Sequence, residues 1–183
     1  MALTVAKVSE EMQGNADEIA RLLDGRTLAC AESCTGGLVT QAFAAVEGSG
    51  EWLRGGVVAY QRESKVDVLG VDPEAPLVSA TVAEQMARGV AQCMHADVAL
   101  ATTGAAGPDG HGGVPPGTVV IATCVDGDVR CMEHHYDDHD DPATVVELAA
   151  RDAITVLANA LAAGRHGSVS VDTGTRARHA ERR

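Results

Sequence analysis

Residues 27–37 read TLACAESCTGG and contain the signals of a buried strand that turns directly into a helix. Thr27–Ala31 is small, apolar and β-branched in composition, and it leaves no room for a helix before the glycine pair Gly36 and Gly37. We therefore predict a strand, a tight turn and then a helix from about Gly36 to Val46.

The same alternation of strands and helices continues on both sides of this segment. Before it, residues 9–23 have apolar positions at three- and four-residue steps, which predicts an amphipathic helix ended by Gly25. After it we predict, in order, a strand over 55–60, a short helix ending at Gly70, a helix to about His95 opened by a Thr81–Glu84 capping box, a strand over 97–103, a hairpin over 118–134 turning at 126–128, and a helix from an Asp141 cap and Pro142 to Gly164.

This order of elements predicts an α/β fold with a mostly parallel sheet covered on both faces, to which the hairpin adds an antiparallel strand. The chain has 183 residues, which suits one domain, here assigned to residues 1–164. Residues 165–183 contain five arginines and two acids and show no periodicity, so we expect a basic, disordered tail.

Composition excludes several classes of partner. Only four residues are aromatic, which disfavours base-stacking platforms, and the net charge of −12 disfavours nucleic-acid and membrane surfaces. The five cysteines form no CxxC pair, and the N-terminus has no stretch resembling a signal peptide, so we expect a cytoplasmic protein with reduced thiols.

Ser33 is the first candidate catalytic residue because it lies where a strand turns into a glycine-opened helix. The backbone N–H groups of Thr35, Gly36 and Gly37 would then point at the group that the serine attacks, as an oxyanion site. The alternative is that Ser33 and Thr35 only cap a helix, and the local pattern alone favours this alternative.

A nucleophilic serine needs a base, and no histidine falls at a predicted strand end beside Ser33. The chain has only two lysines, and Lys65, just past the predicted second strand, could lose its proton when desolvated and accept the serine proton. Tyr60 at the end of that strand could relay or donate a proton. The alternatives are a surface lysine paired with Glu63 or Asp67 and an ordinary strand-end tyrosine.

Two further segments carry polar groups. The loop beginning TTGAAGP offers the Thr102 and Thr103 hydroxyls and the glycines Gly104 and Gly107, where backbone can approach an anion, although it matches neither GxGxxG nor GxxxxGK[ST]. The cluster HHYDDHDD, residues 134–141, suggests metal ligands, but acids before a helix N-terminus are more simply explained by the helix dipole.

Three motifs together resemble the C-terminal domain of the competence/damage-inducible protein CinA, which also occurs as a stand-alone nicotinamide-nucleotide amidase. They are AESCTGG (31–37), GGVVAYQRESKVDVLGV (55–71) and TTGAAGPDGHGGVPPGTVVIA (102–122), and the likeness runs from about Glu10 to Gly164. The resemblance implies a three-layer α/β/α fold with a mixed sheet. It also implies hydrolysis of the carboxamide of nicotinamide mononucleotide to nicotinate mononucleotide and ammonia, without a metal or cofactor.

The resemblance also carries site residues to this sequence. It implies that Ser33 attacks the amide carbon, that Lys65 is general base and then acid, that Tyr60 belongs to the catalytic set, and that Thr103 with Gly104–Gly107 holds the substrate. This chain departs from relatives that carry arginines at the start of the last helix; Arg62, Arg151 or a partner subunit could substitute. Two alternative functions stay open: a non-catalytic nucleotide-binding module and an amidase for another small amide. We also expect a homo-oligomer that acts on a small-molecule substrate.

Overall fold

The strand predicted from residues 27–31 lies inside a five-stranded sheet with the order β2-β1-β3-β4-β5. The computed structural model describes residues 8–107, 109–137 and 141–166. The strands are β1 (Leu28–Glu32), β2 (Leu53–Val58), β3 (Val98–Ala105), β4 (Thr118–Val125) and β5 (Asp128–His135). β1 pairs in parallel with β2 and β3, whereas β4 is antiparallel to both β3 and β5. Every strand except β4 therefore runs in one direction, which confirms the mixed, mostly parallel sheet.

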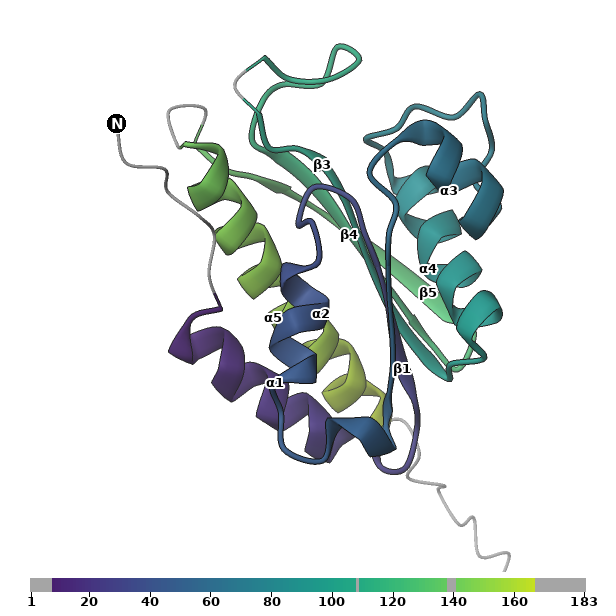
Figure 1. The fold of residues 1–183 in the computed structure, drawn as a ribbon, viewed down its shortest axis with the longest axis vertical. Helices are drawn as coiled ribbons and strands as arrows, with labels where there is room; N and C mark the ends of the chain where they lie inside the picture. The colour runs from purple at the N-terminus through teal and green to yellow at the C-terminus, as the bar shows by residue number, and fades with distance from the viewer. Residues whose placement is uncertain (1–7, 108, 138–140, 167–183) are drawn as a thin grey trace, which may run out of the picture.

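Helices cover both faces of this sheet and make three layers (Figure 1). The helices are α1 (Glu10–Leu23), α2 (Leu38–Ala44), α3 (Arg62–Leu69), α4 (Ala80–Met94) and α5 (Pro142–His166), with a 3-10 turn η1 (Ser49–Glu51). α1, α2 and α5 pack on one face around Phe43 and Ile154, and α3 and α4 pack on the other around Met86. The three-layer α/β/α architecture is thus confirmed, with one apolar core on each side of the sheet.

The helix boundaries follow their capping residues. Ser9 Oγ accepts the amide hydrogen of Met12 at the start of α1, as the predicted boundary requires. The predicted capping box of α4 is wrong, because Ser79 rather than Thr81 is the cap and its Oγ accepts the amide hydrogen of Val82. Ser79 has extended backbone and reaches the open amides first, so Thr81 lies inside the first turn.

Two strands differ from their predicted ranges. β2 begins at Leu53 and ends at Val58, so Tyr60 follows the strand instead of ending it. β3 continues through Gly104 to Ala105, into the segment predicted to be irregular, because these residues pair with Val119 and Thr118. A Cβ at Gly104 would lie 2.8 Å from the carbonyl oxygen of Thr118, so glycine permits this close pairing.

The C-terminal half otherwise follows its turn and cap signals. Asp126 and Gly127 both have left-handed backbone, with φ of 51° and 87°, which is typical of a two-residue hairpin turn. Asp141 Oδ1 accepts the amide hydrogens of Ala143 and Thr144, and α5 begins at Pro142 as predicted. The basic tail was expected to begin at residue 165, but α5 continues to His166; residues 167–183 lie outside the described residues. No helix in the described ranges is long and apolar enough to cross a bilayer.

Candidate active site

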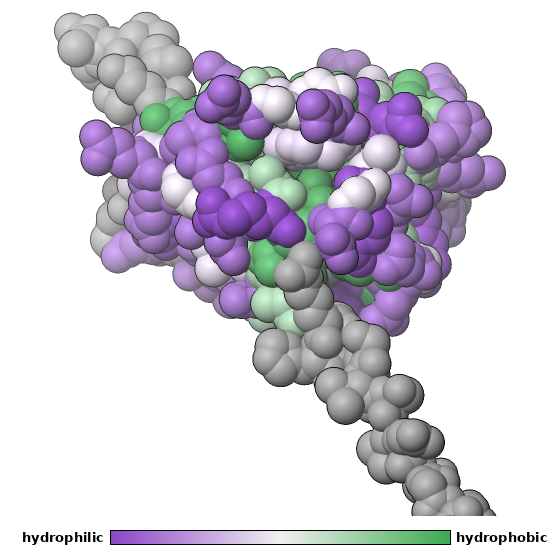
Figure 2. Space-filling model, turned by 90° about the horizontal axis from the view of Figure 1, so that it is seen from below, coloured by the Kyte–Doolittle hydropathy of each residue, from purple (hydrophilic) through white to green (hydrophobic). Residues whose placement is uncertain are grey.

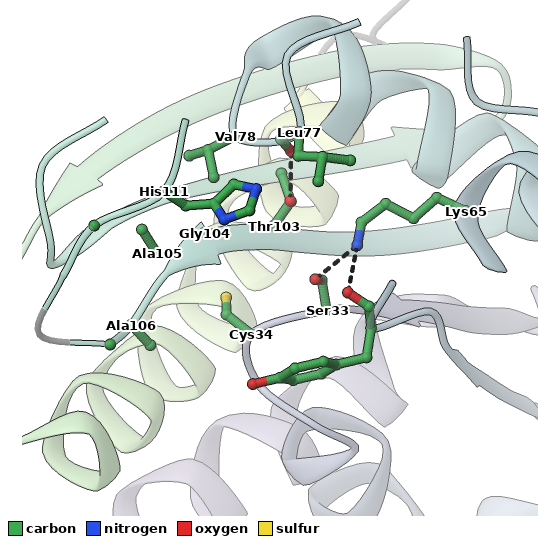
Figure 3. Close-up of a pocket in the computed structure, with 13 residues that line it drawn as sticks. Ser33, Cys34, Lys65, Leu77, Val78, Thr103, Gly104, Ala105, Ala106 and His111 are labelled. Carbon is green, nitrogen blue, oxygen red and sulfur yellow. Dashed lines mark hydrogen bonds between the residues drawn. The ribbon is translucent and has the colours of Figure 1, made fainter. Parts of the chain in front are cut away.

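The carboxyl ends of the neighbouring strands β2, β1 and β3 bring the sequence-predicted residues together. Ser33 follows β1 and donates its amide hydrogen to Thr102 O on β3 at 3.0 Å. Tyr60 follows β2, Lys65 lies in α3, and Thr103 lies in β3. All four residues line a cavity of about 220 Å³ at this edge of the sheet (Figure 3).

Ser33 and Lys65 are in direct contact. Lys65 Nζ lies 2.9 Å from Ser33 Oγ, and it donates to the carbonyl oxygens of Ala59 at 2.7 Å and Tyr60 at 3.1 Å. A carbonyl oxygen can only accept, so these two oxygens occupy two N–H groups of the amine. The remaining tetrahedral position faces the serine. In a neutral amine that position is the lone pair, which can accept the Ser33 proton.

Burial favours this neutral form of Lys65. The side chain is only 1% exposed, and its desolvation lowers the pKa of the amine, with a further lowering from the positive charge of Arg62. Arg62 itself donates to the carbonyl oxygens of Pro73 and Ala75 and so fixes the segment that follows α3. The surface ion pair considered for Lys65 is therefore wrong, because the amine points inward to Ser33.

Tyr60 contributes differently from the way its sequence position suggests. Its side chain is 70% exposed, and its hydroxyl has no hydrogen-bond partner among the described residues. Its backbone carbonyl is the group that contacts Lys65 Nζ. A role for the phenol in proton transfer stays a prediction.

Glu32 organises the turn that presents Ser33. Its carboxylate is 1% exposed and accepts the amide hydrogens of Gly37, Val39 and Thr40 at 2.9, 3.2 and 2.7 Å. It also accepts the hydroxyls of Thr35 and Thr40 at 2.7 and 2.6 Å. A buried carboxylate is stabilised when hydrogen bonds satisfy its oxygen atoms. The Glu32 side chain therefore caps the N-terminus of α2.

This cap corrects the predicted oxyanion site. The amide of Gly37 donates to Glu32, and the amide of Gly36 donates to Ser33 O at 3.2 Å, so both are used internally. The Thr35 hydroxyl lies in the same buried network, 2.8 Å from Thr102 Oγ1. None of these three residues is among those that line the cavity. The amides of Cys34 and Thr35 have no oxygen acceptor in the described part of the chain.

The glycine-rich loop and the connector before α4 form the other wall. Thr103, Gly104 and Gly107 line the cavity, as their predicted binding role requires, and Thr103 Oγ1 donates to Leu77 O at 2.8 Å. Ala105 and Ala106, within the predicted Gly104–Gly107 segment, also line the cavity, whereas sequence reasoning missed Cys34, Leu77, Val78, Gly110 and His111. The signals in the sequence that this loop has a function were its hydroxyls, its glycines and the resemblance of its motif.

Cys34 is not a second nucleophile, and the two arginines considered as substitutes do not line the cavity. Burial raises the pKa of the Cys34 thiol to about 12, so the sulfur stays protonated at neutral pH. Arg62 binds the connector, and Arg151 forms an ion pair with Asp152; neither lines the described cavity.

The histidine- and aspartate-rich segment is divided between different roles. His134 lies 3.6 Å from Asp152, His135 pairs with Glu133, and Asp141 caps α5. Residues 138–140 lie outside the described ranges. Elsewhere in the described chain, no group of three or more histidine, cysteine, aspartate or glutamate side chains is placed to hold a metal ion.

Comparison with known sequences places this chain in a protein family. The model of the CinA C-terminal domain matches residues 12–161. A CinA-like protein of Shewanella baltica is 46% identical over 136 residues, covering 70% of this chain and 32% of the relative. The nicotinamide-nucleotide amidohydrolase PncC of Shewanella oneidensis is 46% identical over 129 residues, covering 67% of this chain and 30% of the relative. The chain spans about a third of the length of these curated relatives.

Solved structures agree with the sequence relatives. A CinA superfamily protein from Klebsiella pneumoniae superposes with a TM-score of 0.78 at 32% identity, covering 83% of this chain and 98% of that structure. A competence/damage-inducible protein from Agrobacterium tumefaciens also gives 0.78 at 32% identity, covering 88% and 99%. The family match, the two sequence relatives and the shared fold lead to one conclusion: this chain belongs to the CinA C-terminal domain family.

Proposed function

We propose that this protein hydrolyses the carboxamide of nicotinamide mononucleotide to nicotinate mononucleotide and ammonia, with Ser33 as nucleophile and Lys65 as base. The observation that carries the proposal is the 2.9 Å contact between Lys65 Nζ and Ser33 Oγ beside a cavity. The substrate is suggested by the Shewanella oneidensis relative, which is named a nicotinamide-nucleotide amidohydrolase.

In the first half of the reaction, Ser33 Oγ attacks the amide carbon while its proton passes to the lone pair of Lys65 Nζ. The carbon–oxygen bond forms, and the carbonyl electrons move to the amide oxygen. Lys65 then gives the proton to the departing nitrogen, the carbon–nitrogen bond breaks, and ammonia leaves an ester on Ser33.

The amide oxygen that becomes negative needs hydrogen-bond donors near Ser33. Cys34 lines the cavity, and its amide has no oxygen acceptor among the described residues. This amide immediately follows the nucleophile, which is a common position for an oxyanion donor in serine hydrolases. Gly36 and Gly37 support the turn instead, through their own internal hydrogen bonds.

In the second half, water attacks the ester carbon, and Lys65 takes one proton from the water. The bond between the carbon and Ser33 Oγ breaks, and the proton returns to the serine. Lys65 therefore acts once as base and once as acid in each half. Ala59 and Tyr60 keep its nitrogen in place throughout, because their carbonyl oxygens hold the two other N–H groups.

The direct test is ammonia release from nicotinamide mononucleotide by the purified chain. We expect turnover in the wild type and a loss of at least about a thousandfold in Ser33→Ala, since removal of a nucleophile leaves only binding and oxyanion stabilisation. Ser64→Ala, the same substitution at a serine of α3 that does not line the cavity, is the matched control. Full activity of Ser33→Ala would overturn the mechanism, whereas binding of the nucleotide without any ammonia from the wild type would favour a binding module.

A further inference from the structure

His111 is a cavity residue to which the catalytic scheme gives no function. It lies in the loop between β3 and β4, whereas Ser33 follows β1, yet both line the same cavity. In Figure 3 the imidazole of His111 points into the cavity beside Thr103, on the side away from Ser33 and Cys34. A side chain there would contact the part of a substrate that is remote from the reacting carbon.

The loop backbone holds His111 in this position. The amide of His111 donates to Val114 O, and the amide of Val114 donates to His111 O, both at 3.0 Å, so the two residues close a small turn. Gly110 has a φ of +64°, and a Cβ there would collide with the carbonyl oxygen of Val114. The turn therefore needs glycine at the position before His111. The hydrogen bonds of the turn fix the position of the His111 backbone, from which the imidazole extends.

The charge of the cavity wall differs from that of the whole chain. The chain carries 26 acidic residues and a net charge of −12, yet no aspartate or glutamate is among the described residues lining the cavity. The side chains there that can become cationic are Lys65 and His111, and the proposed mechanism uses Lys65 in its neutral form. His111 is then the other basic side chain of the wall that could contact an anionic ligand.

Backbone donors lie next to this histidine along the same wall. Ala106 and Gly107 line the cavity, and their amides donate to no acceptor within the described ranges. A Cβ at Gly107 would have no neighbouring atom within 4 Å, so a ligand can approach the backbone there closely. Free amides together with an imidazole are donors that suit phosphate oxygens.

We infer that His111 and the amides of Ala106 and Gly107 form a subsite for the phosphate monoester of the substrate. This inference rests on the proposed function, because it takes the reacting carboxamide to lie at Ser33. This subsite makes the glycine-rich loop the element that distinguishes a nucleotide from the nucleoside without phosphate.

The test compares nicotinamide mononucleotide with nicotinamide riboside, which lacks only the phosphate. We expect His111→Gln to raise KM for the nucleotide about tenfold with kcat nearly unchanged, because the contact between the imidazole and the phosphate is lost. The kcat/KM for the riboside should not change. His95→Gln, the same substitution at an exposed histidine outside the cavity, is the matched control and should alter neither substrate.

An equal loss of kcat/KM for both substrates, or no loss for either, would overturn the subsite. Calorimetry on the Ser33→Ala background separates this result from failure of the proposed function, because it requires no turnover. If the wild type releases no ammonia, tighter binding of the nucleotide than of the riboside that disappears in His111→Gln still supports the subsite, and equal binding in both forms removes it. Inorganic phosphate, titrated alone, should bind more weakly to His111→Gln than to the His95→Gln control, and equal binding also counts against the subsite.

Discussion

Lys65 is held by oxygen atoms from three residues, and this arrangement defines how its activity should depend on pH. Burial lowers the pKa of the amine from its ordinary value of 10.5, so the neutral form becomes available at lower pH than for a surface lysine. Since the neutral form is the base, kcat/KM should rise with pH through the lowered pKa and level off before pH 10.5. The pH profile of ammonia release measures this limb.

The assignment of that limb to Lys65 can be checked by chemical rescue. Lys65→Ala should abolish ammonia release, and added methylamine should restore part of it because a small amine can occupy the space beside Ser33. A profile that falls with rising pH over the same range would contradict a neutral-amine base. Rescue that is equally strong in Ser33→Ala would show that the added amine acts by itself.

Single residues also mark the limit of prediction from this sequence. Ser33 and Lys65 could be paired because the chain has only two lysines and the strand order brings their segments together. The role of Glu32 could not be read, because a carboxylate beside a serine gives no sign that it bonds to amides five to eight positions ahead. His111 was missed for a similar reason: its place depends on how an irregular loop folds back.

At the scale of elements, the packing of α3 against α4 controls where Lys65 lies. Gly89 is in the middle of α4, and a Cβ there would lie 2.8 Å from the carbonyl carbon of Leu69, the last residue of α3. Glycine to alanine normally stabilises a helix by about 1 kcal/mol, but overpacking costs about 1–3 kcal/mol. We expect the clash with rigid backbone to prevail in Gly89→Ala.

The expected result is a net loss of up to about 2 kcal/mol and a melting temperature lower by up to about 8 °C, with slower ammonia release because α3 carries Lys65. Gly14→Ala is the control of opposite sign, because α1 has nothing within 4 Å of that position. It should raise the melting temperature and leave turnover unchanged. Thermal unfolding of both variants measures these changes. A higher melting temperature for Gly89→Ala would show that α3 and α4 move apart without a large cost.

The elements themselves were largely predictable, and their errors have local causes. Periodicity and caps located α1 and α5, and the glycine turn after β1 located α2. The choice of Ser79 over Thr81 as the cap of α4 depends on backbone direction, which the sequence does not give. The extension of β3 to Ala105 could not be foreseen, because glycine usually signals the end of a strand and here allows a close approach of β4.

The whole molecule carries a net charge of −12, and this excess should weaken the folded state in dilute salt. Hydrophilic residues cover much of the end of the molecule opposite the cavity (Figure 2). Raising sodium chloride from about 0.1 M to about 1 M shortens the Debye length from about 10 Å to about 3 Å and screens the repulsion among the excess negative charges. We expect the melting temperature to rise by several degrees, as measured by calorimetry, and a flat dependence would mean that repulsion is already balanced.

The arrangement of the sheet was foreseeable at this scale, since the hairpin at its end supplies the one reversed strand. The expected homo-oligomer stays a prediction for light scattering.

The two walls of the cavity have unequal origins. One wall is anchored in the core through Glu32 and through the carbonyl oxygens that hold Lys65. The other includes one continuous run of small residues from Gly104 to Gly107 and a turn closed by His111 and Val114, in which His111 lines the cavity. Exchange of that loop alone could therefore change which ligand the cavity prefers. The residues that break the amide bond would stay unchanged.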